Sequence, residues 1–323
     1  MDSNTMQGLP HVEATLNYLA EGTERPVSYA YTSPSGTPPT TRRNSPHPVT
    51  IRNARPILSQ LSLDQQGFVL TRQDSKVTNF YDEKEVREVY YPEVERLLKE
   101  VTGAVKVVIF DHVVRCAPKA RQGAHGVREP ARIVHNDYSF KSAPRRVRDH
   151  VPAEAEELLK HRFAEINVWR AIRGPIQESP LALCDARSIA PQDVVTSDLV
   201  YPDRVGEVYR FTYNPAHCWY YFPHLEPSEV VLLKCYDSQD DGRARFTAHT
   251  AFEDPTSPPE AAPRESIEVR ALVFFAPENK DAEPGTTTAS GTTARAAKLG
   301  MPRSTLDSKI RSLKINKHCF KTD

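Results

Sequence analysis

Residues 230–275 read VVLLKCYDSQDDGRARFTAHTAFEDPTSPPEAAPRESIEVRALVFF, and three short segments in them, VVLLKCY, RFTAHTAF and SIEVRALVFF, have the composition of β-strands. Polar turns, one of them rich in proline, separate these segments. The region before them has the same pattern, with INVWRAI at 166–172, EVYRFTY at 207–213 and CWYYF at 218–222. Because no long helices alternate with these strands, the pattern predicts a mainly β fold, a sandwich or barrel, rather than a parallel sheet.

Helices are expected to flank this β-rich region. Apolar residues at helical spacing predict a helix over 83–103 that ends at Gly103, and the run VKVVIFDHVV after it predicts a buried strand. A second, short helix is expected near 152–164.

Composition divides the chain into four parts. Residues 22–60 are rich in Pro, Ser, Thr and Arg, which predicts a connecting N-terminal arm over 1–60. The predicted strands and helices form one main domain over 61–276. Residues 277–292 are polar and of low complexity, as in a linker, and 293–323 form a separate tail.

Overall composition is that of a globular protein. The 323 residues include 42 Lys+Arg and 42 Asp+Glu, so the net charge of the whole chain indicates no polyanionic partner. No apolar run reaches the roughly 20 residues of a membrane-spanning helix, and the N-terminus lacks the pattern of a secretory signal. The five cysteines are scattered and never form a CxxC pair, which is typical of free thiols in a reducing cytoplasm.

The tripeptide His135-Asn136-Asp137 is the strongest candidate for a metal site. Residues i and i+2 of a strand point to the same face, so this spacing directs an imidazole and a carboxylate to one point. Two histidines and one carboxylate on an iron leave positions open for a co-substrate and dioxygen. His249 is the preferred third ligand, with His217 and His224 as alternatives, and a solvated surface turn is the alternative for the tripeptide itself.

The segment RESIEVR at 264–270 suggests how a co-substrate is held. Arg264, Ser266, Glu268 and Arg270 alternate along it, so in a strand they share a face. An arginine fork meets a carboxylate with two hydrogen bonds, and a nearby hydroxyl can add a third. Arg264 with Ser266 is therefore the preferred partner for the far carboxylate of a dicarboxylate co-substrate, with Arg270 as the alternative. An exposed edge strand of alternating charges would give the same pattern.

Long blocks of the sequence, in order from about Val12 to Phe275, resemble one family. They are ATLNYL, LDQQGF, NFYDEKEVREVYYPEVERLLKEVTGA, FDHVVR, VHNDYS, INVWRAIRGPIQESPLALCDARS, NPAHCWYYFPHLEPSEVVLLKCYDS, FTAHTAFEDP and RESIEVRALVF. The family resembled is the asaB-type hydroxylase/desaturase family, also labelled CmcJ/NvfI-like, of Fe(II)/2-oxoglutarate-dependent oxygenases. The resemblance implies a double-stranded β-helix (jelly-roll, cupin-like) core, with Fe(2+) and 2-oxoglutarate as cofactors.

The resemblance also assigns residues to the site. It implies His135, Asp137 and His249 as the metal ligands, with no catalytic residue beyond them. Arg264 and Ser266 correspond to an Arg-x-Ser co-substrate clamp. Asn167 joins Arg264, Ser266 and Arg270 as a cofactor-binding residue. The substrate pocket expected from the resemblance consists of Trp169, Arg170, Arg115, Lys234 and His217. A core position for Trp169 and His217, and ion pairs with Asp185 or Asp237 for the three cations, are the alternatives.

The tail differs from the rest of the chain in charge and in the family that it resembles. Residues 291–323 hold eight Lys and Arg against two Asp, and AAKLGMPRSTLDSKI resembles the C-terminal helix-turn-helix of Fis-type bacterial regulators. Ser304 is a plausible N-cap for the second helix of this small helical tail. A weak DNA contact through 293–323 is one expectation. The other is a basic helical hairpin that docks on the acidic main domain or simply extends from it.

The leading hypothesis is an Fe(II)/2-oxoglutarate-dependent dioxygenase. It would use dioxygen to hydroxylate, desaturate or cyclise a small-molecule substrate of secondary metabolism at a C–H bond, in the cytoplasm and with no membrane partner. The alternative is a ligand- or iron-sensing DNA-binding regulator built on an oxygenase fold. Methyl transfer is disfavoured because no glycine-rich nucleotide loop follows a strand. The substrate, the choice among the three reactions and the oligomeric state stay open.

Overall fold

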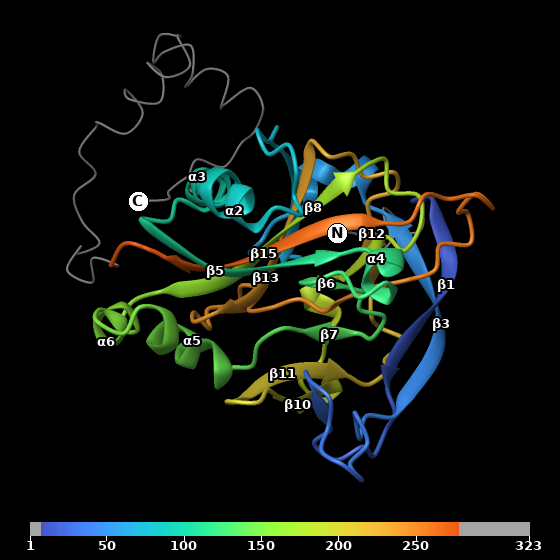
Figure 1. Cartoon of the computed structure of the whole chain (residues 1–323), viewed down its shortest axis with the longest axis horizontal. Coiled ribbons are helices and arrows are strands. Elements are labelled where there is room, and N and C mark those ends of the chain that lie inside the picture. The colour runs from blue at the N-terminus through green and yellow to red at the C-terminus, as the bar shows by residue number, and fades with distance from the viewer. Residues whose placement is uncertain (1–7, 278–323) are drawn as a thin grey trace, which may run out of the picture. The chain divides into compact units, whose positions relative to one another are not determined.

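The computed structural model describes residues 8–277, in which two curled β-sheets pack around a shared core (Figure 1). The expected tail at 293–323, and all of the expected linker except Pro277, lie outside the described residues. The architecture is the jelly-roll that the resemblance implied. None of the helices within 8–277 is long and apolar enough to cross a membrane.

One sheet has six strands, antiparallel except for the last pair. In spatial order they are β4 (Phe68–Arg72), β13 (Glu229–Asp237), β8 (Phe163–Arg173), β15 (Glu265–Phe274), β5 (Lys106–Arg115) and β6 (Val127–Arg128).

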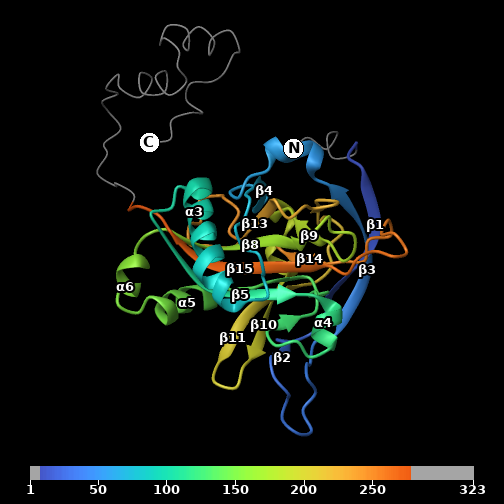
Figure 2. The same cartoon turned by 45° about the horizontal axis from the view of Figure 1, so that its top comes forward.

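The other sheet has nine strands. In order they are β1 (His11–Leu19), β3 (Asn44–Asn53), β12 (Trp219–Tyr221), β9 (Leu181–Cys184), β14 (His249–Ala251), β7 (His135–Asn136), β11 (Val205–Phe211), β10 (Val194–Val200) and β2 (Val27–Tyr29). Both views show β1 and β3 side by side along one flank (Figures 1 and 2).

Side chains of the six-stranded sheet alternate between two cores, as the pleat of a strand requires. In β8, Phe163, Trp169 and Ala171 belong to the core between the sheets, whereas Ile166 and Val168 belong to a second core on the opposite face. The helix α3 (Tyr91–Thr102) covers that opposite face and buries one apolar side against it (Figure 2). This alternation decides which residues of β8, β13 and β15 can reach the inter-sheet space.

Helices are short and peripheral. They are α2 (Glu83–Glu85), a π-helical turn (Val86–Tyr90), α3, α4 (Ala117–Arg121), α5 (Ser142–His150) and α6 (Ala155–Leu158), with 3-10 turns at Arg55–Gln60, Ala186–Ser188 and Pro191–Asp193. The helix expected over 83–103 is confirmed, and Gly103 ends it in the left-handed conformation with φ 73°. The helix expected near 152–164 is only one turn long, at Ala155–Leu158, and the end of the expected range, from Phe163, belongs to β8.

The expected N-terminal arm contributes more structure than its composition predicts. Residues 44–53 form a ten-residue strand rather than a loose connection. The apolar face of β1, including Leu16 and Tyr18, packs on Trp219 in a third core. The Trp219 indole N–H donates a hydrogen bond to the Tyr18 hydroxyl at 2.7 Å, so the segment is fixed to the nine-stranded sheet by buried polar and apolar contacts.

Candidate active site

Strand pairing brings together two histidines that are far apart in the sequence. His249 of β14 lies directly opposite His135 of β7, and their ring centroids are 4.3 Å apart. Asp137 follows β7, with its Oδ1 atom 3.7 Å from His135 Nε2. The potential ligand atoms of these three residues all lie within 4.8 Å of one another.

Hydrogen bonding prepares His135 for a metal. Its Nδ1–H donates to the Ile133 carbonyl at 2.7 Å, which leaves the lone pair of Nε2 on the side of Asp137. Burial lowers the pKa of His135 well below its ordinary value, reinforced by His249, and burial also lowers the pKa of His249. Both imidazoles are therefore neutral, the protonation state that metal binding requires.

Asp137 is held as an anion. Burial raises its pKa, but the charge of Arg270 outweighs burial, and the hydrogen bond from Asn167 acts in the same direction, so the pKa lies well below its usual range. Asn167 donates to Asp137 Oδ2 at 2.7 Å, and Arg270 Nε donates to the same oxygen at 3.3 Å. Since both partners contact Oδ2, Oδ1 is left facing His135. A buried set of two neutral imidazoles and one carboxylate fits a ferrous ion with open positions.

The amide of Asn167 also donates to Glu268 Oε1 at 2.9 Å, so it connects two buried carboxylates. We expect Asn167→Ala to weaken Fe(II) binding about tenfold, because outer partners of a ligating carboxylate orient it and Arg270 alone would remain. A competition titration against a chelator measures this affinity, and an unchanged melting temperature would show that the fold is kept. An Fe(II) affinity equal to that of the wild type would contradict the assignment of Asn167 to Asp137.

A narrow pocket of about 10 Å³ adjoins the histidines on one side. It is lined by Arg115, Ala131, His135, Trp169, Leu181, His249, Thr250, Ala251, Arg264 and Glu268. Arg264 is buried, donates one hydrogen bond to the Ser179 carbonyl at 2.5 Å, and has no partner for its Nε among the described residues. Burial, reinforced by the charge of Arg115, lowers the pKa of Arg264 to about 9.

Ser266 lies two residues after Arg264, and its buried hydroxyl also lacks a partner within residues 8–277. Two unsatisfied donors beside a metal cluster fit a carboxylate of a bound co-substrate, since unpaired buried donors are costly. The pocket is so narrow that these side chains must move apart for a dicarboxylate to enter.

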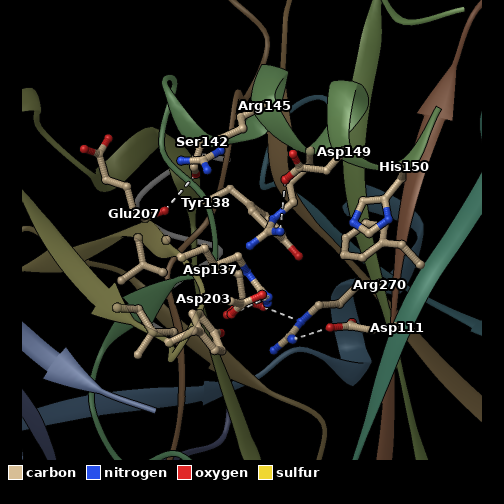
Figure 3. A pocket seen from close by; sticks show the side chains of 17 residues that line it. Asp111, Asp137, Tyr138, Ser142, Arg145, Asp149, His150, Asp203, Glu207 and Arg270 are labelled. Carbon is tan, nitrogen blue, oxygen red and sulfur yellow. Dashed lines mark hydrogen bonds and ion pairs between the residues drawn. The ribbon is translucent and has the colours of Figure 1, made fainter. Parts of the chain in front are cut away.

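A larger cavity of about 430 Å³ opens on the other side of Asp137 (Figure 3). Arg270 lies between Asp137 and Asp111 at its floor, with its Nη1 atom 3.3 Å from Asp111 Oδ2. Its walls come from β5, α5, β10, β11 and the turn between the last two, and they combine charged residues such as Arg145 and Asp203 with aromatic ones such as Tyr138. The metal cluster therefore separates a narrow pocket from a spacious polar one.

Most residues singled out from the sequence converge on this site. They are His135, Asp137, His249, Asn167, Trp169, Arg264, Ser266, Arg270 and Arg115. Arg115 lines the narrow pocket while donating to the Glu129 carbonyl at 2.7 Å.

Three expected substrate-pocket residues lie elsewhere, and strand alternation explains two of them. Arg170 faces the second core, where it donates to the Gln73 carbonyl at 2.8 Å and lies over the Tyr90 ring. Lys234 also points away from the inter-sheet space and pairs with Asp64 at 2.6 Å and Asp237 at 2.8 Å.

His217 is a core histidine, hydrogen-bonded to Asp193 and to the Tyr18 hydroxyl at 3.1 Å each.

Two buried charged residues near the cluster had no assigned role in the sequence analysis. Glu268 Oε1 lies 4.0 Å from His249 Nε2, and its place on the RESIEVR face was the available signal. Arg210 lies directly opposite His135 on β11. Its only sequence signal is a charge within the otherwise apolar and aromatic run VYRFTY.

The chain is similar to several known proteins over most of its length. A family model described as "Oxidoreductase/YMDC permease-like domain" matches residues 16–274. The hydroxylase/desaturase efuI of Hormonema carpetanum is 35% identical, over 84% of this chain and 98% of that protein. The Fe(II)/2-oxoglutarate-dependent dioxygenase nvfI of Aspergillus novofumigatus is 33% identical, over 78% of this chain and 92% of that protein. A solved structure of the iron and alpha-ketoglutarate-dependent endoperoxidase NvfI superposes with a TM-score of 0.75 at 28% identity, covering 82% of this chain and 98% of that one.

Proposed function

The chain belongs to the oxidoreductase family that includes the hydroxylase/desaturase efuI and the dioxygenase nvfI. We propose that it oxidises a small molecule of secondary metabolism at a C–H bond. It is an Fe(II)/2-oxoglutarate-dependent dioxygenase. The observation that carries this conclusion is the cluster of two buried histidines, His135 and His249, with the half-buried Asp137, whose donor atoms fit ferrous iron.

We assign the roles in the site as follows. His135, Asp137 and His249 hold the metal, and Asn167 with Arg270 fixes the orientation of Asp137. Arg264 and Ser266 bind the far carboxylate of 2-oxoglutarate through their unpaired donors. When bound, Fe(II) with 2-oxoglutarate supplies the activation of dioxygen.

The substrate enters from the larger cavity. That cavity reaches Asp137 and Arg270, whereas the narrow pocket lies on the side of Arg264, so co-substrate and substrate approach the metal from different directions. The charged and aromatic lining suits a small molecule with polar groups on an apolar skeleton. Hydroxylation, desaturation and cyclisation are all compatible with this arrangement.

Two measurements on the full chain test the proposal. Addition of 2-oxoglutarate to the anaerobic Fe(II) protein should produce the visible charge-transfer absorption of a chelated keto-acid. In air, the same sample should convert 2-oxoglutarate to succinate, at a slow rate because no substrate is added. If neither the absorption nor succinate appears at one Fe(II) per chain, the proposal is wrong.

Deletion of residues 285–323 is expected to leave both signals unchanged, because the family match ends at residue 274 and the last core strand ends at Phe274.

The alternative of a DNA-binding regulator depends on the tail, which lies outside the described residues. A gel-shift series over increasing salt, with the full and shortened chains, tests it, since binding through several phosphate contacts weakens steeply with salt. Loss of succinate formation on deletion of 285–323 would contradict the prediction that oxygenase activity does not need these residues.

A cytoplasmic location remains part of the proposal. It is supported by the cysteines within 8–277, Cys116, Cys184, Cys218 and Cys235, which are all free.

A further inference from the structure

Arg210 occupies a position beside the metal cluster that the assigned roles do not use. Directly opposed residues of neighbouring strands form a row across the nine-stranded sheet, in the order Leu183, His249, His135 and Arg210. Side chains directly opposite in an antiparallel pair have Cβ atoms about 4.5–5.5 Å apart. Arg210 is therefore the next side chain after His135 on the face that carries both histidines.

The guanidinium of Arg210 is buried without an ion-pair partner among the described residues. Arg210 exposes only 7% of its surface, its Nε has no hydrogen-bond partner, and its guanidinium forms no ion pair with any residue in 8–277. Burial, with the charge of nearby Arg42 adding to it, lowers the pKa of Arg210 to about 10, which still leaves it charged at neutral pH. A buried charge without a partner is strongly unfavourable, so such an arrangement indicates a site kept for a ligand.

The other two buried arginines within 8–277 do have partners. Arg170 donates to the Gln73 carbonyl and side chain, and Arg264 donates to the Ser179 carbonyl. The charge of Asp137 raises the pKa of Arg210, but Asp137 already accepts hydrogen bonds from Asn167 and Arg270. The missing partner is thus an anion that the residues in 8–277 do not supply.

The position of Arg210 indicates where this anion comes from. Arg210 flanks His135 on the side of β11, and Val208, two residues along the same face of that strand, lines the 430 Å³ cavity. Arg264 lies beyond His249 in the narrow pocket, on the opposite flank of the histidine pair. A ligand that reaches Arg210 therefore comes from the substrate cavity rather than from the co-substrate pocket.

We propose that Arg210 binds a carboxylate of the substrate beside the metal, so that the substrate class is a small organic acid. This inference rests on the proposed function, because it presumes that the larger cavity is the substrate site. A guanidinium is the side chain best matched to a carboxylate, which it can bind through two parallel hydrogen bonds. Anchoring the acid next to His135 would fix which C–H bond faces the metal.

The test uses the full chain with anaerobic Fe(II) and saturating 2-oxoglutarate, and acetate as the probe carboxylate. Acetate should raise the melting temperature of the wild type by about 2–4 °C, because a ligand that binds only the folded state stabilises it. Neutral acetamide should have no effect. Arg210→Met should abolish the response to acetate, and Arg145→Met, which removes an exposed arginine of the same cavity, should keep it.

Two further readouts separate this role from the alternatives. Without acetate, Arg210→Met should melt no lower than the wild type, whereas a structural arginine would lower the melting temperature when removed. The charge-transfer absorption should report unchanged 2-oxoglutarate affinity in Arg210→Met. The assignment would be overturned if acetate left the melting temperature of the wild type unchanged, or if it still raised that of Arg210→Met. Weaker 2-oxoglutarate binding by Arg210→Met would also overturn it. If the absorption never forms in the wild type, the proposed function itself fails.

Discussion

Replacement of His249 with alanine is expected to abolish stoichiometric Fe(II) binding and to lower 2-oxoglutarate turnover by more than a hundredfold. Loss of a mere outer-shell partner costs about ten- to a hundredfold in metal affinity or activity, so loss of a direct ligand costs more. His249 is buried between Glu268 and His135 and contributes one of only two imidazoles to the cluster. Iron content per chain and succinate formation measure the effect.

Two other histidines serve as controls for this substitution. His217→Ala should keep iron and turnover while lowering the melting temperature, because His217 is hydrogen-bonded in the core to Tyr18 and Asp193. His224→Ala, at an exposed turn, should change neither. Full iron content and activity in His249→Ala, with their loss in His217→Ala, would transfer the third ligand to His217 and refute the cluster described above.

Two of the three candidate metal ligands could be predicted because their signal is local. His135 and Asp137 share a face through the two-residue repeat of a strand, and that repeat also aligns Arg264 with Ser266. The same repeat, applied to β8, would have excluded Arg170, since Asn167 and Trp169 already define the inter-sheet face. Sequence resemblance placed Arg170 near the site, but alternation places it on the opposite face of the sheet, against Gln73 and Tyr90.

Arg210 shows what local patterns cannot provide. Its position depends on the register of β11 against β7, which pairs residues about 75 positions apart and places Arg210 opposite His135. Register is set by long-range pairing, not by the sequence of either strand alone. A buried arginine in an apolar strand was visible in the sequence, but its neighbour was not.

The strand β3 was missed for a different reason. Pro46 and Pro48 made its segment resemble a loop, since proline cannot donate to a sheet ladder. In the structure, both prolines pair with β1 only, opposite Asn17 and Thr15, whereas β12 joins β3 further on, at Ile51–Asn53. At Pro46 and Pro48, β3 therefore has a partner strand on one side only, so the missing proline N–H groups are tolerated there.

Arg264→Ala is expected to raise the KM for 2-oxoglutarate roughly ten- to a hundredfold, as measured by succinate formation. Loss of a charge-assisted pair with a carboxylate costs about 1.5–3 kcal/mol, which corresponds to that range. Ser266→Ala should act in the same direction with a smaller effect, because it removes one neutral donor. Iron content should stay at the wild-type level in both variants, since neither residue contacts the histidines or Asp137 by a hydrogen bond.

Arg270→Ala provides the decisive comparison, because Arg270 was the alternative clamp. In the structure, Arg270 already contacts Asp137 and Asp111, and it faces the larger cavity. Its removal frees one side of the metal-binding carboxylate, so the expected result is weaker Fe(II) binding with little change in the KM for 2-oxoglutarate at saturating iron. Arg264 differs, since its free Nε and the Ser266 hydroxyl have no other partner among the described residues. If Arg270→Ala instead raised this KM and Arg264→Ala did not, the co-substrate would extend into the larger cavity, and the separation of the two pockets would be wrong.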